Sequence, residues 1–105
     1  YIDNCVQANL LAATANNEAA ADQVYNVAFG QRTTLNELYR MIRERVAAVH
    51  PDCIDREPVY RDFRAGDVRH SLADITKSEQ LLGYTPEYSV SAGLDEAAQW
   101  YLDNI

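Results

Sequence analysis

The sequence predicts an α/β fold with about four helices and a small two-stranded parallel sheet. Strand-forming residues fill two short segments, Gln23–Phe29 and Pro58–Arg61, and an amphipathic helical pattern lies between them. Strand, helix and strand in this order indicate a parallel pair with a right-handed crossover. The chain has 105 residues, of which 48% are apolar and 24% charged, so we treat residues 1–105 as one globular unit.

The first helix is expected from Asn4 to Thr14. Asp3 precedes it and is a suitable N-cap, because its carboxylate can accept hydrogen bonds from the free N–H groups of the first turn. Val6, Leu10 and Ala13 recur at helical spacing and are predicted to form the packed face.

The first strand, Gln23–Phe29, ends at Gly30, and a second helix follows. Thr34 and Glu37 have the spacing of a capping box, in which each side chain satisfies a free N–H group. Pro51 ends this helix. Its apolar residues keep one face: Leu35, Leu38, Ile42, Val46 and Val49.

After the second strand, the polar segment Asp62–Leu72 has no periodicity and is expected to be a loop. Asp74 should cap a short helix that ends at Gly83, because glycine readily takes the left-handed conformation of a helix C-terminus. The last helix should begin near Ser91. Its expected apolar face is Leu94, Ala98, Tyr101 and Ile105. A sheet of only two strands is marginal by itself, which suggests that further chain belongs to the fold.

The formal charge is −7, so nucleic acid and anionic membranes are poor partners. No run of about 18 apolar residues is present, and the start of the chain does not resemble a signal peptide. Because the sequence opens without Met, we expect the natural N-terminus to lie upstream. Cys5 and Cys53 are far apart and lack metal-ligand spacing, which favours reduced structural cysteines in a cytoplasmic protein.

Motifs for catalysis or cofactor binding are absent from the sequence. The four glycines form no glycine-rich loop, and the only lysine, Lys77, has Ala73 rather than Tyr four residues before it. His50 and His70 have no evident catalytic or ligand partners and are interpreted as surface or loop residues. We therefore expect no catalytic residue, metal site or cofactor site in this chain.

One segment stands out in this acidic chain. Of its eight arginines, Arg61, Arg64 and Arg69 lie within nine residues. The planar guanidinium group suits bidentate binding of phosphate oxygens. Gly66 allows a bend that would project Arg64 and Asp67 to the same side, so this loop is the first candidate anion site. The alternative is a solvated loop whose own aspartates neutralise the arginines.

A second candidate is the segment Gly30–Thr33, which contains Gln31. It follows a predicted strand and precedes a helix N-terminus, a position that ligands favour in parallel α/β folds. The alternative interpretation is a capped turn with no ligand.

The sequence also carries five landmarks in a fixed order. They are residues 1–4 (YIDN), 24–27 (VYNV), 61–71 (RDFRAGDVRHS), 73–75 with 81–84, and 93–94 with 100–101. This order resembles the C-terminal third of the extended short-chain dehydrogenases/reductases, the NAD-dependent epimerase/dehydratase family. The wording of residues 64–71 is most similar to bacterial UDP-N-acetylglucosamine 4-epimerases of surface-polysaccharide synthesis.

The resemblance implies an intact enzyme that binds NAD on a Rossmann domain and moves a hydride from and back to C4 of a UDP-sugar. That domain and the Tyr-x-x-x-Lys pair would lie upstream. In this chain, the resemblance implies that Arg64 holds the UDP diphosphate and Asp67 binds the uridine ribose. Gln31 would lie near the nucleotide, and Asn26 would be structural, with its amide paired locally.

By this interpretation the chain is a UDP-sugar-binding fragment that is inactive alone. Without its Rossmann partner domain, it should self-associate or have a disordered loop at Asp62–Leu72. Two alternatives remain open. One is a non-enzymatic helical interaction module that binds a partner through the last helix. The other is a different family member, such as a uronate 4-epimerase or a dehydratase.

Overall fold

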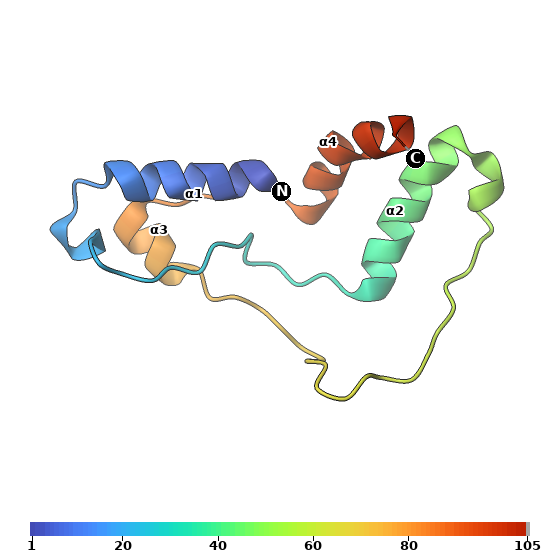
Figure 1. Ribbon diagram of the computed structural model, residues 1–105, viewed down its shortest axis with the longest axis horizontal. Coiled ribbons are helices and arrows are strands. Elements are labelled where there is room, and N and C mark those ends of the chain that lie inside the picture. The colour runs from blue at the N-terminus through green and yellow to red at the C-terminus, as the bar shows by residue number, and fades with distance from the viewer. Residues whose placement is uncertain (105) are drawn as a thin grey trace. The chain divides into compact units, whose positions relative to one another are not determined.

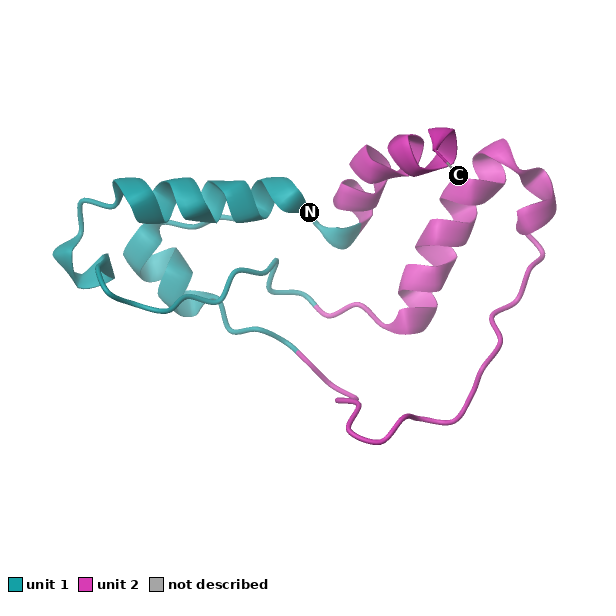
Figure 2. Cartoon of the chain, in the orientation of Figure 1, with its two compact units in different colours: residues 1–31, 72–90 teal, residues 32–71, 91–105 magenta. Residues whose placement is uncertain are grey.

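The computed structural model describes residues 1–104 (Figure 1). Its helical elements, in chain order, are α1 (Ile2–Thr14), η1 (Glu18–Ala20), α2 (Leu35–Val49), η2 (Pro51–Cys53), α3 (Thr76–Leu82) and α4 (Val90–Asp103). The chain divides into two compact units, shown in Figure 2. Unit 1 comprises residues 1–31 and 72–90, and unit 2 comprises residues 32–71 and 91–105.

The predicted two-stranded sheet is wrong, since residues 1–104 contain four α-helices and no β-strand. Gln23–Phe29 lies in unit 1, and Pro58–Arg61 lies in unit 2. A strand needs a neighbouring backbone to satisfy its N–H and C=O groups, and β-forming residues alone do not supply one.

In unit 1, side chains take the place of a partner strand along the first of these segments. The Ser78 hydroxyl donates to the carbonyl of Asn26 at 3.0 Å, and the Tyr84 hydroxyl donates to the carbonyl of Ala28 at 3.1 Å. The Asn26 amide donates to the carbonyl of Asp74 at 3.0 Å, 48 residues away. Asn26 is therefore structural as expected, but its amide pairs with a distant residue rather than locally.

Helix α1 begins at Ile2, earlier than expected, and Tyr1 is its N-cap without a side-chain hydrogen bond. Asp3 lies inside the first turn, so its predicted role as N-cap is wrong. At that position its carboxylate still interacts favourably with the positive end of the helix dipole.

The buried face of α1 also differs from the predicted one. Asn4 and Ala8, four residues apart, are buried, whereas the side chains of Val6 and Leu10 are 47% and 61% exposed. Asn4 is buried because its side chain makes three hydrogen bonds to the segment before α4. Its Oδ1 accepts from the N–H groups of Glu87 and Tyr88, each at 3.1 Å, and its Nδ2 donates to the carbonyl of Tyr88 at 2.8 Å.

The core of unit 1 is small and lies where α1, η1 and α3 meet. It consists of Ala8, Ala20, Leu82 and Tyr84, with Leu11, Tyr25 and Leu81 packed against it. Tyr84 is only 1% exposed. Burial raises the pKa of Tyr84, with a smaller contribution from Cys5, so this phenol stays protonated as a hydrogen-bond donor.

Helix α3 has the predicted ends, shifted by one residue at its start. Ile75 is the N-cap, and the Asp74 carboxylate accepts from the N–H of Thr76 at 2.9 Å. Hydrogen bonds from Thr76 lower the pKa of Asp74. At the other end, Gly83 has a φ of 68°, and its N–H bonds the carbonyl of Glu79. The predicted glycine C-cap is therefore confirmed.

Helix α2 in unit 2 begins with the predicted capping box. The Thr34 hydroxyl accepts from the N–H of Glu37 at 3.2 Å, and the Glu37 carboxylate accepts from the N–H of Thr34 at 2.7 Å. The helix ends at Val49, just before Pro51 as expected, and Pro51 opens η2, which was not predicted. The apolar stripe of α2 is largely uncovered, because no residue of the helix is buried and Leu35 is 82% exposed.

Helix α4 begins one residue before the predicted Ser91. Arg45 of α2 donates from Nε to Asp95 at 2.8 Å and from Nη2 to the carbonyl of Ser91 at 3.0 Å, so it connects the two helices of unit 2. Leu94 and Ala98 of the predicted face are half-buried, and Tyr101 is exposed. Ile105, the last member, lies outside the described residues.

Both cysteines are free. Cys5 is exposed and Cys53 is half-buried. Among residues 1–104, no helix combines the length and apolar character needed to cross a bilayer.

The Asn4 contacts generate a stability prediction. Asn4→Leu leaves one carbonyl and two N–H groups without their partner, so it should lower the free energy of unfolding by about 2–3 kcal/mol. Asn9→Leu, in the same helix, removes only an exposed bond to the carbonyl of Cys5. It should change stability by less than about 0.5 kcal/mol. Urea denaturation measures both, and equal effects would contradict the proposed role of Asn4.

The capping box generates a pH prediction. Hydrogen bonds from Thr34 hold the pKa of Glu37 below its ordinary value of 4.5. Its stabilising contribution is therefore complete above about pH 4.5 and lost as the pH falls through the lower, folded-state pKa. Wild type should be more stable than Glu37→Gln at pH 7, and the difference should disappear on acidification.

Thr34→Ala is the companion variant, because it removes the hydroxyl that donates to the Glu37 carboxylate at 2.9 Å and leaves the backbone N–H donor of residue 34 in place. It should reduce stability at pH 7 by about 1 kcal/mol and weaken this pH dependence without abolishing it. Thr33→Ala, one residue earlier, should leave both unchanged. Thermal unfolding between pH 3 and 7 checks the series, and a pH dependence in Thr34→Ala as large as that of the wild type would refute the role of the hydroxyl.

Candidate functional site

The arginine-rich segment is an exposed loop in unit 2, and all residues from 61 to 71 are exposed. Its tip is a tight turn, in which the N–H of Asp67 donates to the carbonyl of Arg64 at 3.3 Å. Gly66, at the third position of the turn, has a φ of 88°. That left-handed conformation favours glycine and is typical of type II turns. The bend expected at Gly66 is therefore confirmed.

The turn brings the two principal candidate residues together. Arg64 Nε lies 3.4 Å from Asp67 Oδ2, and the two side chains are 87% and 47% exposed. As predicted, both project to the same side of the loop. An exposed pair of this kind contributes about 0–1 kcal/mol, so both groups can exchange this contact for a ligand at little cost.

The other arginines of the loop have different environments. The Arg69 guanidinium lies over the Phe63 ring at 4.3 Å and closes the base of the turn by a cation–π contact. Arg61 lines a shallow surface hollow with Tyr60 and Asp62. Arg64 is thus the arginine that the turn itself places beside a carboxylate.

The second candidate, Gln31, ends the first part of unit 1, whereas Arg64 and Asp67 belong to unit 2. Gly30 before it has a φ of 77°, and a Cβ built there would lie 3.2 Å from Ile75 Cδ1. Gln31 is exposed, and the Thr34 capping box lies three residues further on. The helix cap expected from the alternative interpretation, in which this segment binds no ligand, is therefore present. A ligand role for Gln31 stays a prediction.

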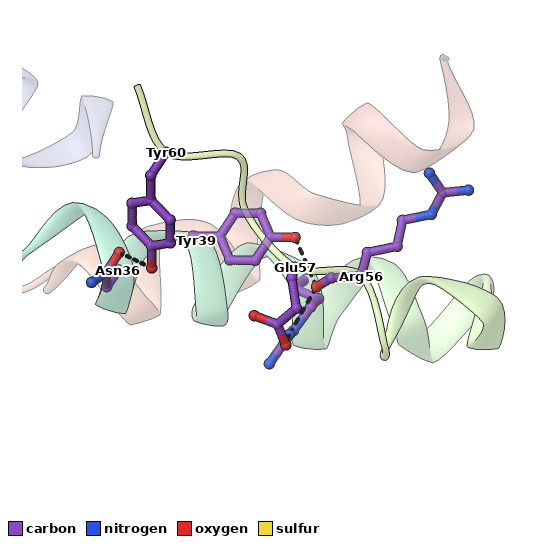
Figure 3. A network of polar contacts seen from close by, with 6 residues as sticks. Asn36, Tyr39, Arg56, Glu57 and Tyr60 are labelled. Atoms are coloured by element: carbon purple, nitrogen blue, oxygen red, sulfur yellow. Dashed lines mark hydrogen bonds and ion pairs between the residues drawn. The ribbon is translucent and has the colours of Figure 1, made fainter. Parts of the chain in front are cut away.

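A polar network that the sequence analysis missed holds the segment leading into the loop (Figure 3). The Tyr39 hydroxyl and Arg43 Nη1 both donate to the carbonyl of Arg56, each at 2.9 Å, and the Tyr60 hydroxyl donates to Asn36 Oδ1 at 3.1 Å. The available signal was a polar stripe on α2 at positions 36, 39 and 43. Its spacing of three and four residues places these side chains on one helix face.

Comparison with solved structures gives a close match. A UDP-glucose 4-epimerase from Thermotoga maritima, crystallised with UDP-glucose, superposes with a TM-score of 0.81 and is 35% identical. The match covers 98% of this chain and 30% of that chain. It lies in the C-terminal portion of the epimerase.

Curated relatives agree with this match. A dTDP-L-rhamnose 4-epimerase from Burkholderia thailandensis is 31% identical over 93% of this chain and 25% of its own length. A UDP-glucose 4-epimerase from Mycolicibacterium smegmatis is 30% identical over 96% of this chain and 29% of its own length. This chain therefore spans between a quarter and a third of these nucleotide-sugar 4-epimerases. No protein-family profile matches it.

Proposed function

We propose that this chain is the nucleotide-binding C-terminal portion of an NAD-dependent UDP-sugar 4-epimerase. Its similarity to 4-epimerases over nearly its whole length supports this proposal, as does its likeness to an epimerase crystallised with UDP-glucose. The observation that carries it is the turn at Gly66, which presents an exposed guanidinium and an exposed carboxylate 3.4 Å apart. In a nucleoside diphosphate, the phosphates suit a guanidinium and the ribose hydroxyls suit a carboxylate, and the two lie close together.

The two groups would divide the nucleotide between them. Arg64 would hold the diphosphate, because its planar fork matches phosphate oxygens in a bidentate way. Asp67 would accept hydrogen bonds from the ribose hydroxyls. Binding would replace the weak contact between the two side chains with charge-assisted bonds to the ligand. Gln31 is proposed as a further residue near the nucleotide.

Residues 1–105 do not fit NAD. The four glycines are isolated, and Lys77 lacks the tyrosine partner of a Tyr-x-x-x-Lys pair. We therefore place NAD and all catalytic residues of the proposed enzyme on a Rossmann domain outside this sequence, and residues 1–105 form the substrate-binding domain. The chain alone would be inactive and would bind UDP-sugars weakly, because half of the pocket would be missing.

The proposed sugar is UDP-N-acetylglucosamine, and the proposed setting is cytoplasmic synthesis of bacterial surface polysaccharide. This assignment rests on the resemblance of residues 64–71 to such epimerases, since the relatives described above are named for UDP-glucose and dTDP-L-rhamnose. Self-association of the isolated chain is a further proposal. The exposed apolar stripe of α2 supports it, because uncovered apolar surface favours contacts between copies.

The roles of the turn are tested by substitution in the full-length enzyme that contains this chain. Arg64→Ala should raise the Kd for UDP about 10- to 100-fold, because it removes charge-assisted bonds to the diphosphate. The KM for the UDP-sugar should rise in parallel, with kcat little changed. Calorimetry and steady-state kinetics measure these values.

Arg40→Ala is the matched control, since Arg40 is an exposed arginine that forms an ion pair with Glu44 on α2, outside the loop. It should leave UDP binding unchanged. Asp67→Ala should weaken UDP binding and should weaken binding of inorganic diphosphate less, because the proposed contact is to ribose. Unchanged UDP affinity in Arg64→Ala would mean that the loop faces elsewhere.

The sugar assignment is tested by product analysis. The full-length enzyme should interconvert UDP-N-acetylglucosamine and its C4 epimer with a higher kcat/KM than UDP-glucose and its C4 epimer. Separation of the equilibrated products by chromatography gives the answer. A preference for UDP-glucose, or formation of a dehydrated product, would reject the proposed subtype while leaving the UDP-binding role of the loop intact.

A further inference from the structure

The segment before the loop is fixed to α2 at one backbone carbonyl. The carbonyl of Arg56 accepts two hydrogen bonds, from the Tyr39 hydroxyl and from Arg43 Nη1, each at 2.9 Å. A carbonyl oxygen has two lone pairs, so these donors use its full capacity. Two donors from one helix also fix the orientation of the peptide plane, and thus the direction in which the chain continues.

Arg43 is itself held in place for this task. Its guanidinium lies over the Tyr39 ring at 5.7 Å, and its Nη1 lies 3.4 Å from Glu57 Oε1. Its side chain is only 22% exposed, and its Nε is buried without a hydrogen-bond partner among the described residues. Arg43 therefore contacts this segment from a side chain that is itself largely covered, although the hydrogen bonds it makes lie at the surface.

A second attachment lies four residues further along the chain. The Tyr60 hydroxyl donates to Asn36 Oδ1 at 3.1 Å. Asn36, Tyr39 and Arg43 lie three and four residues apart, on one stripe of α2, and Figure 3 shows Arg56, Glu57 and Tyr60 alongside that helix. Among the described residues, the hydrogen bonds from these three side chains to the rest of the chain go to the short segment Arg56–Tyr60, so α2 holds the segment at both ends.

Beyond Tyr60 the loop has only internal contacts among the interactions of the described residues. These are the turn, the Arg64–Asp67 pair and the Phe63–Arg69 stack. Arg64 lies four positions after Tyr60, a span of at most about 14 Å of extended chain. Within unit 2, the position of the turn therefore depends on where α2 places Tyr60.

We propose that Asn36, Tyr39 and Arg43 are positioning residues, and that their grip on Arg56–Tyr60 sets the place of the Arg64–Asp67 turn for a nucleoside diphosphate. The inference rests on the proposed function, because it deepens the account of the same site. None of the three needs to touch the ligand. They act by limiting the positions the loop can take, which lowers the ordering cost of binding.

The test uses the full-length enzyme and near-isosteric changes at the Tyr60 attachment. Tyr60→Phe keeps the ring and removes the donor, and Asn36→Leu keeps the size and removes the acceptor. Each should raise the Kd for UDP and the KM for the UDP-sugar about 3- to 10-fold, as expected for one lost hydrogen bond, with kcat unchanged. Tyr39→Phe should act in the same direction through Arg56.

Two matched variants separate positioning from general destabilisation. Asn36→Asp keeps an acceptor oxygen for the Tyr60 hydroxyl and should restore UDP affinity to the wild-type value. Tyr101→Phe removes a hydroxyl from an exposed tyrosine on α4 and should change nothing. A merely structural role predicts instead a lower melting temperature and a fall in kcat, with no rescue by aspartate.

The outcomes distinguish the two proposals. If Arg64→Ala weakens UDP binding while Asn36→Leu, Tyr39→Phe and Tyr60→Phe leave it unchanged, the positioning role is wrong and the UDP site stands. If Arg64→Ala has no effect, the proposed function itself fails. Should Asn36→Leu not fold, Tyr60→Phe decides, because it removes one exposed oxygen and leaves α2 unaltered. Equal weakening in Asn36→Leu and Asn36→Asp would also overturn the inference.

Discussion

Side-chain donors that bond the carbonyls of extended backbone are the interaction on which both units depend. An extended segment without a neighbouring strand leaves its polar backbone groups unsatisfied. In unit 1, Ser78 and Tyr84 bond two such carbonyls. In unit 2, Tyr39 and Arg43 bond the carbonyl of Arg56. Side chains on α2, on α3 and just after α3 therefore satisfy carbonyls in these segments that a neighbouring strand would satisfy in a sheet.

This arrangement explains why α2 has two faces with different tasks. Its apolar stripe is largely exposed, with Leu35 and Val49 at 82% and 53%. Among the described residues, burial of apolar surface therefore contributes little to the stability of this helix. Its capping box at Thr34 and Glu37 satisfies the first turn locally. The polar stripe of Asn36, Tyr39 and Arg43 lies on this helix and bonds the segment Arg56–Tyr60, which belongs to no helix or strand.

Local chemistry determines what the sequence predicted correctly. The capping box and the Gly83 C-cap involve residues within one or two helical turns, and the Arg64–Asp67 convergence needs only Gly66 between them. The two strands failed because strand formation depends on a partner that spacing does not reveal. The buried face of α1 failed for a related reason: Asn4 is buried by bonds to backbone more than 80 residues away, while more apolar neighbours stay exposed.

The contacts within the Arg64–Asp67 turn differ from those of the segment before it in whether ligand binding would change them. The Arg64–Asp67 pair is exposed and worth about 0–1 kcal/mol, less than the roughly 1.5–3 kcal/mol of a charge-assisted bond to a ligand. In the proposed complex, a diphosphate would therefore displace this pair with a net gain. The bonds to Arg56 and Tyr60 lie outside the turn, so they need not break when the tip rearranges. The Arg64–Asp67 turn can therefore rearrange around a nucleotide while the segment Arg56–Tyr60 stays bonded to α2.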